Sequence, residues 1–456
     1  MTDVFSAATR YLSIILICIY MIIAFLSMGN ISKAGKRKLF YYEGIIISVI
    51  YMMYTITTWL KTKSINALVL CLVSYIVMLV IVFIYCKIYP KSNKFLLMNI
   101  WLMLSIGSLI LLRISYTKAL RQFVMGAVTL VITLIVPYII SKVKFFRNYY
   151  YSYAAFGILL LLIVLVIGNV TYGAKLSLSF GFISVQPSEF IKITYPMFIA
   201  GMLYRRADIK NVVITSALCC IHIIILVLSK DLGSALIFSV AYLFMVYVAT
   251  GKKIILPAGL LAGCVAAGIA YLLFSHVQVR VAAWLNPWDI IDNNGYQIAQ
   301  SIFAIGTGSF FGMGLYDGNP NYIPVVEQDF IFSAISEEMG GFFALALLLL
   351  CFHTFVIMIR IAFKCSDHFY KLTCFGMAVI YGIQVFLTVG GAVKLIPSTG
   401  VTLPLISYGG SSLVSTLLMF AIIQGFNIYD GKEIKENTGE TGKISGTEKK
   451  QYKKTE

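Results

Sequence analysis

The chain consists of successive apolar blocks, most of them about 20 residues long, joined by short turns. A helix of that length spans the hydrocarbon core of a bilayer, where the backbone must satisfy its own hydrogen bonds. The blocks are too long for β-barrel strands and do not alternate with period two. Only 12% of the residues are charged, against about 25% in soluble domains. We therefore predict an all-α polytopic membrane protein with about 13 transmembrane helices. These begin near residues 11, 39, 67, 95, 123, 151, 187, 211, 232, 254, 329, 369 and 404.

The basic residues indicate how the chain is oriented in the membrane. The net charge is +17, but Lys and Arg lie in short turns between apolar blocks, and no nucleic-acid-binding motif accompanies them. One set of alternate turns holds about twice as many cations as the other, which marks it as cytoplasmic. The N-terminus is then predicted outside and the C-terminus in the cytoplasm. Nucleic acid is not expected as a partner.

Cysteine and histidine residues give no sign of a metal site. The nine Cys residues lie in or beside apolar segments without a CxxC pair, and the four His residues are scattered. They are typical of small buried side chains rather than of disulfides or metal ligands. We predict no structural metal site.

One long polar stretch, residues 280–340, interrupts the apolar pattern and runs directly into another apolar block. Long loops in membrane proteins commonly carry function. The stretch defines an extracytoplasmic loop at 275–328 within a membrane core at 150–429. Before it, residues 1–149 form an N-terminal transmembrane addition of about five helices, the last two belonging to the core. Residues 430–456 are polar and mixed in charge, and we predict a disordered cytoplasmic tail.

Asp329 lies where this loop becomes apolar, and Glu337 and Glu338 follow within the predicted membrane helix. Carboxylates at membrane depth are usually functional or paired. On one continuous helix, Glu337 would lie about 80° and Glu338 about 180° round from Asp329, so they cannot stack beneath it. We assign the chemistry to Asp329 and a pairing role with helix cations to the glutamates. The alternative is that Asp329 only caps a helix.

Four further segments carry polar or amphipathic side chains, and each has a plain alternative. Pro187 to Glu189 and Asp231 favour helix N-termini, so capping alone would explain them. Trp284 and Pro287 suit an interfacial anchor, and residues 284–314 suit a surface-lying lid or a re-entrant segment. Ser411 and Ser412 follow two glycines, and they serve either close helix packing or a broken helix lining a polar cavity.

Five motifs occur in a fixed order along the chain. They are QPSEFIKI, KDLGSALIF, NPWDIIDNNGYQIAQSIFAIGTGSFFGMGL, QDFIFSAISEEMG and GVTLPLISYGGSS. Taken together, over residues 150 to 428, they resemble the SEDS family, which includes FtsW, RodA and SpoVE. Its members are peptidoglycan polymerases of the bacterial plasma membrane that join lipid II units and work with a class B penicillin-binding protein. The resemblance implies other divisome or elongasome partners, and division, elongation or sporulation as the process.

The resemblance assigns family roles to particular positions. The family's essential loop aspartate falls on Asp329, its QPSE motif on Gln186, Pro187, Ser188 and Glu189, and its PDLGTA-like motif on Asp231, Gly233 and Ser234. The chain departs from the family in having about three extra helices before residue 150. It also has QDFIF for TDFIF, Thr388 for a common Asn, and GAKLS for GARRW, which leaves Lys175 as the only cation there.

The implied reaction is inverting glycosyl transfer from an undecaprenyl-pyrophosphate-linked donor. Asp329 is then the single base, and Arg280, Lys175 and Lys394 are candidates to hold pyrophosphate, with or without a divalent cation. Gln186, Ser188, Glu189, Asp231, Ser411 and Ser412 are candidate substrate-binding residues. Two alternatives stay open: a lipid II flippase, with Glu337, Glu338 and the last helix lining a path, and a noncatalytic scaffold for a penicillin-binding protein.

Overall fold

The computed structural model describes residues 2–142, 148–171, 174–180, 183–204, 207–293 and 295–428. The tail predicted at 430–456 lies outside these residues. The described part contains 12 helices long and apolar enough to cross a membrane. The 17-residue helix α7 fills the remaining predicted position, so the prediction of an all-α polytopic membrane protein is confirmed.

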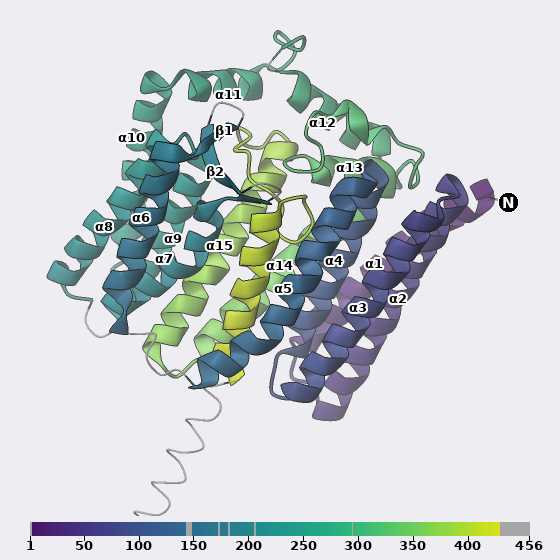
Figure 1. Ribbon diagram of the computed structural model, residues 1–456, viewed down its shortest axis with the longest axis horizontal. Coiled ribbons are helices and arrows are strands. Elements are labelled where there is room, and N and C mark those ends of the chain that lie inside the picture. Colours follow the sequence, from purple (N-terminus) through teal and green to yellow (C-terminus); the bar gives the residue numbers. More distant parts are fainter. Residues whose placement is uncertain are drawn as a thin grey trace, which may run out of the picture.

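The helices form a single bundle. Figure 1 shows α1–α3 at one side, α6–α10 at the other, and α4, α5, α14, α15 and the last helix between them, while α11 and α12 lie across one end of the bundle. We call that end the loop end. The helix bounds are α1 Thr2–Ser27, α2 Lys33–Thr62, α3 Ile65–Ile88, α4 Lys94–Ile114, α5 Tyr116–Lys142, α6 Tyr150–Ile167, α7 Pro187–Leu203, α8 Ile209–Leu228, α9 Leu232–Thr250, α10 Ile255–Leu273, α11 Ser275–Leu285, α12 Tyr296–Gly308, η2 Pro320–Tyr322, α13 Ile331–Met339, α14 Gly341–Lys364, α15 His368–Ala392 and the C-terminal helix Gly410–Ile428.

Many helices begin at a side chain that caps their free N–H groups. Ser64 accepts from the backbone N–H of Ala67 at the start of α3, and Asp367 accepts from that of Phe369 at the start of α15. Such caps satisfy backbone donors that have no partner inside the helix. The same role is played by Ser32, Asn93, Asp208 and Asp231 for α2, α4, α8 and α9.

A small antiparallel sheet, ordered β1-β2-β3, lies between α6 and α7 near the loop end (Figure 1). Its strands are β1 Asn169–Thr171, β2 Ala174–Phe180 and β3 Ile183–Val185. In register, Val170 faces Lys175 and Leu178 faces Val185. The sequence analysis predicted no strand here, although the alternation of apolar and polar residues in KLSLSF is a period-two signal.

The membrane helix predicted to start near residue 329 is split in two. Gly340 has a φ of 95°, and it separates the nine-residue α13 from α14. A Cβ atom on Gly340 would lie 2.4 Å from the carbonyl carbon of Phe311, so the glycine also allows the loop backbone to pack closely. The spans therefore start at Gly341 and Gly410 rather than near 329 and 404.

Residues 394–409 connect α15 to the C-terminal helix, and we call them the linker segment. The segment packs back into the bundle, where Leu405 and Ile406 are buried. A Cβ atom on Gly107 of α4 would lie 2.8 Å from the backbone oxygen of Ile406 and 2.9 Å from its Cα. The linker segment therefore rests directly on the backbone of α4.

We expect Gly107→Ala to destabilise the protein by about 1–3 kcal/mol, because the added methyl group meets backbone atoms rather than a movable side chain. Thermal unfolding in detergent measures the change. Gly44→Ala in α2 is the matched control, since nothing lies within 4 Å of its Cβ position and alanine favours helix by up to about 1 kcal/mol. Equal stability of the two variants would contradict this packing.

Candidate active site

Asp329 lies in the turn before α13 and is half-buried. Its neighbours come from α11 and the linker segment: Gly400 has Arg280 Nη2 3.7 Å and Asp329 Oδ2 3.8 Å from its Cβ position. Arg280 Nη1 also donates to the backbone oxygen of Ser398 at 3.2 Å. One carboxylate and one guanidinium, distant in sequence, thus meet beside a glycine.

The pKa of Asp329 is raised to about 6, chiefly by burial. The charge of Arg280 lowers that pKa and the charge of Glu327 raises it. A carboxylate that titrates near pH 6 is ionised at neutral pH and is a better proton acceptor than an exposed one. The environment therefore favours a general base.

The chain leading into Asp329 is held by three contacts. Ser407 Oγ donates to the backbone oxygen of Gln328 at 2.5 Å, and the backbone N–H of Tyr408 donates to that of Glu327 at 2.7 Å. Lys118 Nζ of α5 lies 2.5 Å from Glu327 Oε1. The linker segment and α5 together fix the position of the carboxylate.

Glu337 and Glu338 lie in α13 and are buried. Arg113 Nε at the loop end of α4 lies 2.8 Å from Glu338 Oε1, and the backbone N–H of Asn319 donates to Glu337 Oε1 at 3.0 Å. Both glutamates therefore lie in the short helix α13 and not, as expected, in the membrane helix itself, because the span starts only at Gly341. Their partners are Arg113 of α4 and the loop residue Asn319.

Burial is the largest influence on both glutamates. It raises the pKa of Glu337, and it raises the pKa of Glu338 to about 7 against the opposing charge of Arg113. Among the described residues, the Oε2 atoms of both side chains are buried without a hydrogen-bond partner. These carboxyls are thus linked to α4 and the loop rather than to Asp329.

Three cations in the turns predicted to face outward pair with loop carboxylates. The pairs are Lys61 with Asp317 at 2.8 Å, Arg113 with Glu338 at 2.8 Å and Lys118 with Glu327 at 2.5 Å. Sequence reasoning did not identify these cations as part of the site. The sequence signal that could have identified them is their position, because outward turns are normally poor in Lys and Arg.

A polar cluster joins α7, α9 and the C-terminal helix. We call Gln186, Ser188, Asp231, Ser234 and Ser411 the QPSE cluster. Asp231 Oδ1 accepts from the Ser234 backbone N–H at 3.1 Å and its Oδ2 accepts from Ser188 Oγ at 3.0 Å. Gln186 donates through its backbone N–H to Ser411 Oγ at 3.0 Å. Asp231 therefore both caps α9 and binds α7.

A buried ion pair lies beside the QPSE cluster. Lys192 Nζ lies 2.7 Å from Glu189 Oε1 and donates to Gln384 Oε1 of α15 at 2.9 Å. Ser415 Oγ donates to Glu189 Oε2 at 3.1 Å, and Gln384 Nε2 donates to Ser412 Oγ at 3.3 Å. This network joins α7, α15 and the C-terminal helix.

The linker segment lies between the QPSE cluster and the pair formed by Asp329 and Arg280. A Cβ atom on Gly233 would lie 3.1 Å from the backbone oxygen of Thr399, one residue before Gly400. Thr388 Oγ1 of α15 donates to the backbone oxygen of Val401 at 2.8 Å. The structure thus places the predicted residues Gln186, Ser188, Glu189, Asp231, Ser411 and Ser412 around one side of this segment, with Arg280 and Asp329 beside Gly400.

The other predicted residues have different surroundings. Lys394 has a φ of 58°, and its backbone oxygen accepts from Trp284 Nε1 at 3.1 Å. Pro287 is buried, and a Cβ atom on Gly295 would lie 2.2 Å from its backbone oxygen. Lys175 lies in β2, and its side chain is outside the described part of the structure. Trp284 and Pro287 therefore tie α11 and the loop to their neighbours.

Within the part of the chain that the structure describes, no group of three or more His, Cys, Asp or Glu side chains is arranged to hold a metal ion. The residues that meet at Gly400 offer one acid and one cation. They could accept a proton and bind an anion.

Comparisons with known proteins give a consistent result. Residues 93–430 match the FtsW, RodA and SpoVE family, described as cell cycle proteins. The chain is 36% identical over 269 residues to peptidoglycan glycosyltransferase RodA of Mycobacterium leprae, covering 55% of this chain and 57% of that protein. It thus spans little more than half the length of that relative. It is 31% identical over 314 residues to a probable peptidoglycan glycosyltransferase FtsW of Escherichia coli, covering 66% of this chain and 74% of that one.

Two solved structures share the fold. One is described as "Structural coordination of polymerization and crosslinking by a peptidoglycan synthase complex", with a TM-score of 0.63, 25% identity, and coverage of 74% of this chain and 97% of that chain. The other is the rod shape determining protein RodA of Thermus thermophilus, with a TM-score of 0.56, 24% identity, and coverage of 74% and 96%. Helices α1–α3 precede the residues that match the family.

Proposed function

This chain belongs to the FtsW, RodA and SpoVE family of cell cycle proteins, and from that premise we propose that it is a peptidoglycan glycosyltransferase that polymerises lipid II. The observation that carries the proposal is the half-buried carboxylate of Asp329, with Arg280 beside it and a pKa of about 6. The relatives named as peptidoglycan glycosyltransferases support the same reaction class.

In the proposed reaction, the 4-hydroxyl of an acceptor GlcNAc attacks C1 of a lipid-linked MurNAc. The new bond forms as the bond from C1 to the pyrophosphate oxygen breaks, and C1 inverts. Asp329 accepts the hydroxyl proton. Undecaprenyl pyrophosphate leaves as a stable anion, so it needs positive charge more than a proton, and a second acid is not required. That agrees with a site that has one carboxylate at Gly400 rather than a glycosidase-like pair.

Arg280 is the first candidate to stabilise the leaving pyrophosphate, because its guanidinium lies beside Gly400 and Asp329. Lys394 and Lys175 are further candidates from the sequence. A divalent cation bound to the pyrophosphate itself would add to this charge. The QPSE cluster and Ser412 are proposed to bind the sugar or peptide portion of the substrate.

The protein is a multi-pass bacterial membrane protein, and we propose that its loop end is extracytoplasmic and its C-terminus cytoplasmic. The support is the distribution of basic residues: the turns at the opposite end of the bundle hold about twice as many Lys and Arg residues as those at the loop end.

We propose a class B penicillin-binding protein as the partner. The support is a fold shared with a chain from a complex described as coordinating polymerisation and crosslinking. The transpeptidase would use the glycan strand that this chain makes, in division, elongation or sporulation.

The test is a reconstituted assay with purified protein in vesicles that present lipid II on one leaflet. It scores glycan polymer separately from lipid translocation, with and without the cognate transpeptidase, and with and without a chelator. Polymer formation supports the proposal. Translocation without polymer would indicate a flippase, and neither activity in the presence of the partner would indicate a scaffold.

We expect the polymerisation rate of the unmodified protein to fall as pH drops through about 6, because Asp329 is then protonated. Arg280→Gln removes the charge that lowers the pKa of Asp329, so the acid limb of the pH profile should move to higher pH. Rates from pH 5 to 8 measure the shift. Arg121→Gln is the control, since Arg121 is not among the charges acting on Asp329; an unshifted limb in Arg280→Gln would contradict the assignment.

A further inference from the structure

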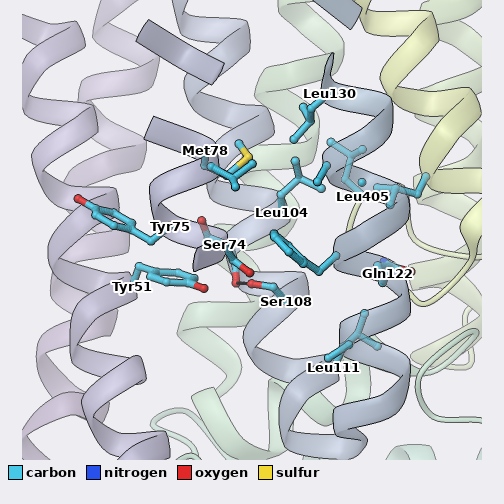
Figure 2. Close-up of a pocket in the computed structure, with 17 residues that line it drawn as sticks. Tyr51, Ser74, Tyr75, Met78, Leu104, Ser108, Leu111, Gln122, Leu130 and Leu405 are labelled. Atoms are coloured by element: carbon cyan, nitrogen blue, oxygen red, sulfur yellow. Dashed lines mark hydrogen bonds between the residues drawn. The ribbon is translucent and has the colours of Figure 1, made fainter. Parts of the chain in front are cut away.

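A cavity lies between the N-terminal helices and the family core. Figure 2 shows side chains of α2, α3, α4, α5 and the linker segment that line it, with Leu130 toward one end and Leu111 toward the other. The cavity is partly open at one side, and its empty volume of about 590 Å³ includes that open space. We call it the α3–α5 cavity. Because α2 and α3 precede the family match, this space exists only where the N-terminal helices meet the core.

A second cavity, whose empty volume of about 350 Å³ likewise includes open space, lies next to it toward the far end of the bundle. Leu130 lines both, and Ile81, Tyr85 and Leu417 line the second. Along α5 the two run from Ala119 to Thr133, which is about 21 Å at 1.5 Å per residue. The two spaces share Leu130 in their walls and lie one after the other along α5.

The lining is largely apolar, and three of its hydroxyl groups already donate to backbone oxygens. Tyr51 donates to the backbone oxygen of Cys71, Ser74 to that of Leu70, and Ser108 to that of Ser105. Leu104, Met78 and Phe123 form much of the remaining wall. A polar ligand would gain few hydrogen bonds here, whereas a hydrocarbon chain would bury its surface against these side chains.

The cavity is directly linked to the candidate active site. Gln122, in its wall, donates to the backbone oxygen of Ser407 at 2.8 Å and accepts from the backbone N–H of Gly409 at 3.1 Å. Ser407 in turn binds Gln328, the residue before Asp329. Leu405 of the linker segment also lines the cavity. The same segment therefore forms one wall of the cavity and supports the carboxylate.

We propose that the α3–α5 cavity holds part of the polyprenyl chain of the lipid-linked substrate, so that the N-terminal helices complete a tail site beside the core. This inference rests on the proposed function. A polyprenyl chain is apolar, as is most of the lining of the cavity. Its attached headgroup must reach Asp329, to which Gln122 and Ser407 connect the cavity.

The test uses full-length protein in phospholipid nanodiscs and two photoactivatable probes. One is a polyprenyl pyrophosphate with a diazirine in its chain, and the other is phosphatidylglycerol with a diazirine in an acyl chain. We expect the polyprenyl probe to label Met78, Phe123 and Leu130. Ala127→Phe, which fills the cavity, should reduce this labelling about tenfold, equivalent to 1.4 kcal/mol. Val128→Phe is the control because its side chain is 58% exposed.

A second variant that fills the cavity, Ser74→Leu, is tested in case Ala127→Phe does not fold. Thermal unfolding of each variant is measured together with the labelling. Equal labelling by the phospholipid probe, or unchanged labelling in both folded filling variants, would overturn the inference. Asp329→Asn should label normally. If the unmodified protein is labelled but makes no polymer, the proposed function is contradicted and the tail site is supported. If it makes polymer but is not labelled, the tail site is contradicted and the proposed function is supported.

Discussion

Replacing Asp329 with asparagine should abolish polymerisation of lipid II, with a loss of at least about 10²–10⁴-fold, which is the range for removing a general base. Asparagine keeps the size and shape of the side chain but cannot accept the hydroxyl proton at neutral pH. Folding should persist, because Asp329 is half-buried with a raised pKa and the neutral amide avoids burying a charge. Polymer formed from purified lipid II is the measurement.

Two controls distinguish chemistry from structure. Asp317→Asn also removes a loop carboxylate, but one that pairs with Lys61 and is 38% exposed, so it should retain most activity. Asp329→Glu keeps the charge and should retain more activity than Asp329→Asn. Full activity in a folded Asp329→Asn protein would exclude Asp329 as the base.

The position of Asp329 was predictable because it depends on local sequence. A long polar loop meets an apolar block at this residue, and a carboxylate at such a boundary is expensive unless it has a role. Arg280 was predictable as a candidate because it is the only Lys or Arg in residues 280–340. Their meeting beside Gly400 was not, since it depends on how the linker segment folds back from α15.

The glutamates show what helix boundaries change. Counting 100° per residue from Asp329 assumes that Asp329 lies on the helix, whereas α13 begins at Ile331. Gly340 then ends α13 after Met339, before the span that starts at Gly341, and Glu338 pairs with Arg113 of α4. A glycine at positive φ could be suspected from the GG pair, but the direction of the turn depends on contacts with residues 310–312, which sequence spacing does not reveal.

The polar motifs illustrate a different limit. For Asp231, the sequence predicted a helix N-cap, and the structure shows that the same side chain also accepts from Ser188 Oγ of α7. Lys192 was not identified at all, because a lysine three residues after Glu189 is common on helix surfaces. Its role depends on burial by α15 and the C-terminal helix, which are about 190 to 220 residues away in sequence.

The second large effect is expected from Lys192→Met. The side chains of Lys192 and Glu189 are only 4% and 7% exposed, so removing the lysine leaves a buried carboxylate without its cation. Breaking such a pair typically costs about 3–5 kcal/mol, more than the pair itself contributes. Gln384 also loses the donor for its side-chain oxygen. Thermal unfolding in detergent should show a clear loss of stability.

The contrast with a double variant separates this explanation from simple loss of packing. Adding Glu189→Gln to Lys192→Met removes the unpaired charge, and the new amide can still bind Ser415, so the double variant should be more stable than Lys192→Met alone. Lys210→Met is the surface control, because Lys210 is exposed in α8 and its loss should change stability by at most about 0.5 kcal/mol. If the losses of stability caused by Lys192→Met and Glu189→Gln were simply additive, the unpaired buried charge would not explain the effect of Lys192→Met. In that case α7 would be held to α15 and the C-terminal helix mainly by its apolar contacts.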